Sequence, residues 1–175
     1  MRSTLLFSFL LLFFSQSNAQ QLSVNDLNFL IGTWQTEEHN HATNWWEKST
    51  RTGIYILDSM FIQLESVAVN SSHKKRTYRF LIHYYNKSKQ FEMVCIYSNW
   101  PKVRTEILQW DKVNRKLTLK SKPASDEYSE REGIIQFSEN FNEYVWKGTN
   151  KGGDPQKPSI FEYEEKGKKE KACNE

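Results

Sequence analysis

The chain has 175 residues, long enough for one ordinary domain with a real hydrophobic core. Charged residues make up 26% of it, yet 24 lysines and arginines against 21 acids leave a formal net charge of only +3. A charge this small, with both signs interspersed, argues against a dedicated nucleic-acid binder.

The N-terminal sequence is typical of a secretory signal peptide. Met1-Arg2-Ser3 gives a short positive start, Leu5 to Phe14 is an almost unbroken apolar run, and Ser15 to Ala19 supplies small residues for cleavage after Ala19. The run is shorter than the ~20 residues that a hydrocarbon core requires, although a retained membrane anchor is the alternative. We therefore expect a secreted or periplasmic protein.

One domain is predicted for the mature chain. Residues 1–19 form the signal peptide, residues 20–166 the domain, and residues 167–175 a charged tail in which lysine and glutamate mix. No later stretch reaches transmembrane length, so no membrane span is expected after cleavage.

A short helix opens the domain. Ser23 can cap it, with Asp26 three residues on, as in a capping box. Leu27, Leu30 and Ile31 give it one apolar side, and Gly32 ends it.

From Thr33 onward the pattern favours short strands rich in aromatic and β-branched residues, separated by turns of Asn, Ser, Gly and Pro. The predicted strands are Thr33–Glu37, Thr43–Ser49, Thr52–Asp58, Met60–Val69, Arg76–Tyr85, Gln90–Ser98, Val103–Trp110, Lys116–Ser121, Arg131–Phe137, Glu143–Gly148 and Ser159–Glu165. Their even spacing is typical of an antiparallel meander. An open sheet of this size would leave unpaired edges. We therefore predict an all-β fold, a single antiparallel meandering barrel of about ten strands, with a two-sheet sandwich as the alternative.

Alternation within the strands suggests which side chains line an interior. Tyr78, Phe80, Ile82 and Tyr84 share one face of their strand, and Thr77, Arg79, Leu81 and His83 share the other. Aromatic side chains fill barrels and also line pockets for apolar or planar ligands. The candidate ligand-binding residues are Tyr78, Phe80, Ile82, Tyr84, Trp46, Met60, Ile62 and Trp110.

The segment LNFLIGTWQTE, from Leu27 to Glu37, resembles the calycin superfamily, whose barrels open with a Gly-x-Trp. The whole chain is most similar to uncharacterised lipocalin-like domains with a FLIGTW opening. Those domains also show a Tyr-Asn hairpin like Tyr85 to Phe91 here, and a late Trp-x-Gly like Trp146-Lys147-Gly148. The resemblance implies a barrel with an internal cavity and no agreed activity. It makes Gly32, Thr33 and Trp34 structural, with the tryptophan packed across one barrel end under a basic residue of the last strand.

The cysteines are Cys95 and Cys173. In an oxidising compartment an exposed thiol tends to pair, so one reading is a disulfide that fastens the tail to a central strand. The other is a buried free Cys95 with Cys173 unpaired or joined to another molecule.

Two histidine arrangements raise the question of metal or haem. Glu37 to His41 contains His39 and His41, which would share a face if the segment were a strand. An exposed polar turn is the favoured interpretation, so no metal site is predicted. His83 could serve as a haem ligand or a base, but it falls on the face opposite the aromatic stripe, and no cofactor is expected.

Catalytic motifs such as Gly-x-Ser-x-Gly, His-Glu-x-x-His and Gly-rich phosphate loops do not occur in the sequence, so an enzyme is not favoured. Asn70 and Asn86 head N-glycosylation sequons whose use depends on the host.

The favoured hypothesis is an exported barrel that binds a small apolar or amphipathic ligand without transforming it. The first alternative is a closed-core interaction module with an aromatic patch near Trp45-Trp46 or Trp100. The second is an enzyme with polar side chains such as Arg79 or Glu65 meeting His83 at a cavity mouth. The sequence does not define the ligand, protein partners or oligomeric state.

Overall fold

The computed structural model describes residues 22–122, 129–154 and 156–171. Within these ranges the chain forms ten strands and one short 3-10 helix, η1 (Val24–Leu30). The strands are β1 (Gly32–Asn40), β2 (Trp45–Ile56), β3 (Phe61–Asn70), β4 (Lys75–Tyr85), β5 (Gln90–Tyr97), β6 (Trp100–Asp111), β7 (Lys116–Ser121), β8 (Ser129–Phe137), β9 (Glu143–Asp154) and β10 (Lys157–Lys169).

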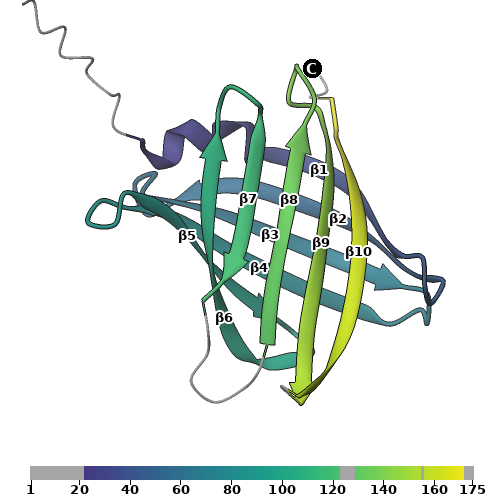
Figure 1. Ribbon diagram of the computed structural model, residues 1–175. Coiled ribbons are helices and arrows are strands. Elements are labelled where there is room, and N and C mark those ends of the chain that lie inside the picture. The colour runs from purple at the N-terminus through teal and green to yellow at the C-terminus, as the bar shows by residue number, and fades with distance from the viewer. Residues whose placement is uncertain (1–21, 123–128, 155, 172–175) are drawn as a thin grey trace, which may run out of the picture.

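The strands close into a single antiparallel barrel (Figure 1). Each strand pairs with its neighbours in sequence, and β1 completes the ring by pairing with β10, from Trp34 opposite Lys169 to His39 opposite Glu164. Closure pairs the backbone groups that an open sheet would leave at its edges. The predicted all-β barrel with a short N-terminal helix is confirmed, and the two-sheet sandwich is excluded.

Several predicted strand boundaries were wrong, among them the end of the last strand, since β10 continues past Glu165 to Lys169. Thr43–Ser49 and Thr52–Asp58 are parts of one strand, β2, in which Arg51 pairs with Trp34 on one side and Ser66 on the other. The inward alternation continues through this stretch, so the chain has no reason to turn there. Likewise β1 continues to Asn40, and β9 continues through Gly152-Gly153, where we expected a turn. Both glycines remain in the strand because β10 pairs with them, and Gly153 adopts a positive φ of +89° there.

Helix η1 covers one end of the barrel, which we call the helix end (Figure 1). The predicted capping box forms, since the Ser23 backbone N–H donates to Asp26 Oδ2 at 2.8 Å. Leu27 is fully buried, and the ring of Phe29 lies 4.7 Å from the ring centroids of both Trp110 and Phe137. These contacts fill the helix end with apolar side chains.

Trp34 lies just inside this end and is 1% exposed. Its Nε1 donates to the Leu30 carbonyl at 3.3 Å, and Lys169 Nζ from β10 lies 5.4 Å from its ring centroid. Gly32, with φ +112°, makes the bend between η1 and β1, and a Cβ there would stand 2.9 Å from Lys169 Cε. The tryptophan thus lies under a basic residue of the last strand, the position that the calycin resemblance implies.

We call the opposite end, where the β1–β2, β3–β4, β5–β6 and β9–β10 connections gather, the open end. Cys95 on β5 is fully buried, with a free thiol. Cys173 and the predicted signal peptide lie outside the described residues, so the disulfide and the cleavage site stay predictions. Within the described ranges, no helix combines the length and the apolar character needed to cross a membrane.

The two sequon asparagines differ in accessibility. Asn70 is 8% exposed, and its Oδ1 accepts from the backbone N–H groups of Ser72 at 3.0 Å and Lys74 at 3.1 Å. Asn86 is exposed in the turn after β4. Its side chain is therefore the more accessible of the two in the folded protein.

Candidate functional site

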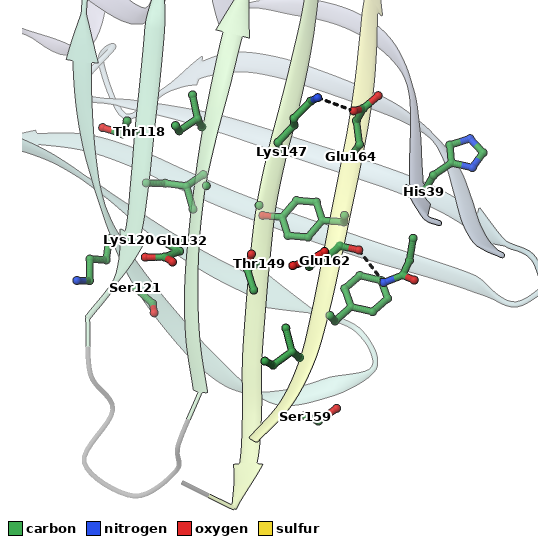
Figure 2. A pocket seen from close by; sticks show the side chains of 18 of the residues that line it. His39, Thr118, Lys120, Ser121, Glu132, Lys147, Thr149, Ser159, Glu162 and Glu164 are labelled. Atoms are coloured by element: carbon green, nitrogen blue, oxygen red, sulfur yellow. Dashed lines mark hydrogen bonds and ion pairs between the residues drawn. The ribbon is translucent and has the colours of Figure 1, made fainter. Parts of the chain in front are cut away.

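A surface groove of about 1450 Å³ lies along the outer wall of β6 to β10, bordered by the β1–β2 connection (Figure 2). Lys147 on β9 and Glu164 on β10 form an ion pair at 3.0 Å between adjacent strands of its wall, and the Lys147 side chain is 70% exposed. Ile134 and Ile160 lie on its floor and are also exposed. Water already solvates these polar groups, so the groove offers little that would fix the orientation of a ligand.

A smaller cavity of about 360 Å³ lies inside the barrel at the open end. This size is within the ~300–1,000 Å³ of small-molecule sites. Side chains from β1, β2, β4, β5, β6, β8, β9 and β10 and from the β5–β6 turn line it. The lining residues are Glu38, Trp45, Arg51, Arg76, Tyr78, Phe80, Tyr97, Asn99, Arg104, Arg131, Trp146, Asn150, Phe161 and Glu165. On each strand these residues alternate with outward-facing ones, which places ionised groups and aromatic rings together in the interior.

Arg51 and Glu165 form an ion pair in the cavity wall, and both are almost completely buried. Arg51 Nη1 and Nη2 donate to the two carboxylate oxygens at 2.9 Å each, and Arg51 Nε donates to Ser66 Oγ at 2.8 Å. The Tyr144 hydroxyl donates to the same carboxylate at 2.5 Å. Burial raises the pKa of Tyr144 well above its ordinary value, so its proton stays in place. Bidentate pairing of this kind compensates much of the cost of burying two charges.

Glu106 is fully buried and is shared by two arginines. Its Oε1 lies 3.0 Å from Arg104 Nε and 3.4 Å from Arg131 Nη1. Arg131 also donates to the hydroxyl groups of Tyr163 at 2.8 Å and Tyr97 at 3.0 Å. The guanidinium of Arg131 lies 4.4 Å from the ring centroid of Trp146, within the range of cation–π attraction.

A third charged cluster lies at the rim of the cavity. Arg76 Nε donates to Glu47 Oε2 at 2.7 Å, and the Tyr78 hydroxyl makes a very short hydrogen bond to the other oxygen of Glu47. The Arg76 guanidinium lies 5.3 Å from the ring centroid of Trp45, whose ring meets that of Phe161 edge-on at 5.4 Å. The aromatic rings of Trp45 and Phe161 thus lie at the mouth of the cavity, next to the Arg76–Glu47 ion pair.

Glu38 is the exception among the cavity carboxyls. In the strand register it stands between Glu165 of β10 and Glu47 of β2. No hydrogen bond or ion pair joins its carboxyl to any group within the described ranges. Burial, followed by the negative charge of Glu165, raises the pKa of Glu38 from its ordinary 4.5 to about 8. At neutral pH this carboxyl is therefore mostly uncharged and free to bond with a guest.

Other polar atoms around the cavity also lack partners. Among the described residues, Trp146 Nε1, Asn150 Oδ1 and Glu106 Oε2 are buried without a hydrogen bond. Because buried polar atoms in folded proteins are nearly always hydrogen-bonded, these atoms offer hydrogen bonds to ordered water or to a polar ligand in the cavity.

The predicted ligand-binding residues divide into three groups. Tyr78 and Phe80 line the cavity. Ile62 and Ile82 are buried core residues at 0% and 1% exposure, and Tyr84 and Trp110 pack against that core. Trp46 lies on the outer wall with Lys48 Nζ 5.9 Å from its ring, and Met60 is 67% exposed in the β2–β3 turn. Trp46 and Met60 do not line the cavity, because Trp46 is on the outward-facing side of β2 and Met60 lies beyond the end of that strand.

The histidine arrangements do not form sites within the described ranges. His39 Nε2 lies 2.8 Å from Glu37 Oε1, and its ring stacks on that of His41 at 5.8 Å, but no group of three or more metal-ligating side chains was found there. His83 contacts Phe61 and Glu92, away from the cavity. Arg79 and Glu65 form an exposed pair on the outer wall, so these groups do not converge on a cavity mouth.

The sequence analysis did not predict the charged residues of the cavity lining, although the alternation pattern of the strands contained an indication of them. Arg104 and Glu106 share strand parity with the buried Leu108, as Arg76 does with Phe80. Charges that alternate in phase with apolar residues indicate an interior polar network, but parity alone does not say which face points inward.

No protein-family model matches the chain, and no curated protein matches it. Solved structures do. CPES from Guillardia theta, an S-type phycobiliprotein lyase, superposes with a TM-score of 0.60 at 12% identity, over 87% of this chain and 95% of its own. Rv2717c from M. tuberculosis gives 0.61 at 10% identity, over 85% and 97%. A de novo designed fluorescence-activating β-barrel gives 0.47 at 10% identity, over 82% and 95%. At such identities the likeness to CPES and Rv2717c shows the fold alone, a closed antiparallel β-barrel.

Proposed function

We propose that this protein binds a small amphipathic ligand in the open-end cavity without transforming it. The observation that carries the proposal is the cavity of about 360 Å³, in which aromatic rings surround a carboxyl and other buried polar atoms without partners. Rings such as Trp45 and Phe161 supply apolar contact for a planar group, and the polar atoms can fix its orientation. The structural relative CPES is a phycobiliprotein lyase by name, which is compatible with a ligand-binding use of this fold.

The interior cavity is a preorganised binding site, whereas the outer-wall groove is not. Most lining arginines and carboxylates are held by ion pairs and hydrogen bonds before any ligand arrives. Such preorganisation lowers the ordering cost of binding. The same fixed pairs occupy most of the groups that general acid–base chemistry would need, Glu38 excepted, which favours binding over catalysis.

A pair of adjacent tryptophans provides the test. Trp45 lines the cavity and Trp46 lies on the outer wall. The fluorescent probe N-phenylnaphthylamine should bind the wild-type protein, and Trp45→Ala should weaken binding about tenfold, or about 1.4 kcal/mol. Trp46→Ala should change it less than about twofold.

A third variant, Ile134→Ser on the floor of the outer-wall groove, separates the two hollows. Probe binding that ignores Trp45→Ala and falls with Ile134→Ser would place the ligand outside the barrel and overturn the proposal. Circular dichroism of each variant shows whether the barrel is intact.

We also propose that the protein is exported, on the strength of the signal-peptide pattern in residues 1–19. Expression of the full chain in a secreting host should give a product that begins at Gln20, as read by intact-mass measurement. Recovery of an uncleaved chain in the cell would contradict this proposal.

A further inference from the structure

The arginines of the cavity lining are already engaged with carboxylates of the barrel. The ion pairs in the described part of the chain are Arg51–Glu165, Arg76–Glu47, Arg104–Glu106 and Arg131–Glu106. A charged group on a ligand, of either sign, would have to displace one of these partners. Breaking a largely buried ion pair is costly because it leaves an uncompensated charge. The lining therefore favours a ligand without a net charge.

Two polar side chains of the lining, Glu38 and Asn150, have no partner of their own. The carboxyl of Glu38 makes no hydrogen bond or ion pair within the described ranges, and Asn150 Oδ1 is buried there without a hydrogen bond. The indole Nε1 of Trp146 instead lies against Gly133, where an added Cβ would stand 2.8 Å from it, and Glu106 is not part of the lining. Glu38 and Asn150 are therefore the polar groups with which the cavity can recognise a guest.

Both side chains lie close to the pair of aromatic rings at the mouth. The rings of Trp45 on β2 and Phe161 on β10 meet at 5.4 Å, and β1, which carries Glu38, runs between these two strands. Glu38 stands opposite Glu47, two residues from Trp45 on the inward face of β2, and Asn150 on β9 stands opposite Phe161. A planar group packed against the two rings would therefore have one of these polar side chains beside each ring.

The two side chains offer hydrogen bonds of a neutral kind. Ionised Glu38 would stand between Glu165 and Glu47 in the strand register, and like charges on neighbouring strands repel each other. The raised pKa of Glu38, caused by burial and then by Glu165, agrees with this geometry. A protonated carboxyl and the carboxamide of Asn150 can each donate and accept. They suit an uncharged ligand group that also does both, such as an amide or a hydroxyl.

Resting on the ligand-binding function proposed above, we infer that the ligand is an uncharged planar ring compound with an amide or a hydroxyl group, which Glu38 and Asn150 recognise by hydrogen bonds. These two residues determine specificity, and the rings of Trp45 and Phe161 supply the apolar contact. A site of this kind rejects an analogue that lacks the donor, because buried polar groups of the site then stay unpaired.

Four naphthalene derivatives of one ring isomer test the ligand class. Near neutral pH naphthamide is uncharged and donates hydrogen bonds, methyl naphthoate is uncharged and has no donor, naphthoate is an anion, and naphthylmethylamine is a cation. Displacement of N-phenylnaphthylamine from the wild-type protein measures the affinity of each. Naphthamide should bind at least about fivefold more tightly than the methyl ester and at least about tenfold more tightly than either charged probe.

Substitutions at the two polar positions test the recognition. Asn150→Leu and Glu38→Met remove the hydrogen-bonding group at similar size, and each should lower the preference for naphthamide over the ester to about twofold or less. Glu38→Gln keeps an uncharged hydrogen-bonding group and should retain the preference. Thr149→Val is the matched control, since Thr149 neighbours Asn150 but lines the outer-wall groove (Figure 2). Each preference is a ratio of two affinities of the same variant, so partial misfolding does not change it.

The inference is overturned if naphthamide fails to displace N-phenylnaphthylamine, or if the ester or a charged probe binds as tightly as naphthamide. It is also overturned if Asn150→Leu or Glu38→Met keeps the wild-type preference, or if Glu38→Gln loses it. These results leave the ligand-binding function standing, since that function fails only if no probe depends on Trp45.

Discussion

The raised pKa of Glu38 makes the stability of the fold depend on pH. Its pKa of about 8 in the folded protein lies above the ordinary 4.5 that it regains on unfolding, so the folded protein retains a proton that the unfolded chain loses. The contribution to stability is full below pH 4.5 and is lost as pH rises to about 8. We expect the free energy of unfolding of the wild type to fall across this window relative to Glu38→Gln. Urea unfolding at a series of pH values measures the difference, and a constant difference would refute the expectation.

For the Arg51–Glu165 ion pair, we expect that removing one partner lowers the stability of the fold more than removing both. Arg51→Met leaves the buried Glu165 carboxylate without its bidentate donor and should cost about 3–5 kcal/mol. The double variant Arg51→Met, Glu165→Gln should recover much of that loss, because the uncompensated charge is gone. Denaturant unfolding of both variants checks this, and a double variant no more stable than the single would count against it.

The Cys95 thiol is shielded by the interior. Burial, with the nearby charge of Glu106, raises its pKa to about 12, so it should resist a thiol reagent at about pH 8 until the protein unfolds. The same titration on unfolded, unreduced protein examines the predicted bridge to Cys173. No reactive thiol would reveal that bridge, whereas two would show that it does not form.

At the scale of elements, η1 acts as the closure of one barrel end. Phe29 brings its ring against Trp110, Phe137 and Phe141, so Phe29→Ala should cost about 3–5 kcal/mol. Asn28→Ala, an exposed neighbour, should change stability by less than about 0.5 kcal/mol. Thermal unfolding of the two variants provides the comparison. Equal midpoints would mean that η1 packs too loosely to contribute.

Elements with strong local signals could be predicted, and those that depend on long-range pairing could not. The Ser23–Asp26 capping box and the inward face of Phe80 and Ile82 follow from local chemistry and alternation. The extent of β1 and β9 depends on partners far along the chain, which overrode the turn preference of Gly152-Gly153. Likewise, the meeting of Arg51 with Glu165 is set by barrel closure, which no local pattern encodes.

At the scale of the whole molecule, the barrel has one sealed end and one chemically distinctive end. Apolar rings fill the helix end, and arginines, carboxylates and aromatic rings surround the cavity at the other. Under the proposed function, a ligand would therefore enter at the open end, past Trp45 and Phe161, which line the cavity. The predicted barrel followed from strand spacing alone, but its polar interior required knowing which face of each strand turns inward.

The pairing of β1 with β10 also sets the order in which the molecule can form. Trp34 pairs with Lys169, so the ring cannot close until nearly the whole chain is available. Pairing between segments so distant in sequence is slow compared with forming adjacent hairpins. A chain emerging from a ribosome or a translocation pore would assemble β2 to β9 as consecutive hairpins while β1 waits with an unpaired edge. That interval is when the growing polypeptide is most exposed to aggregation, and the last strand to emerge ends it.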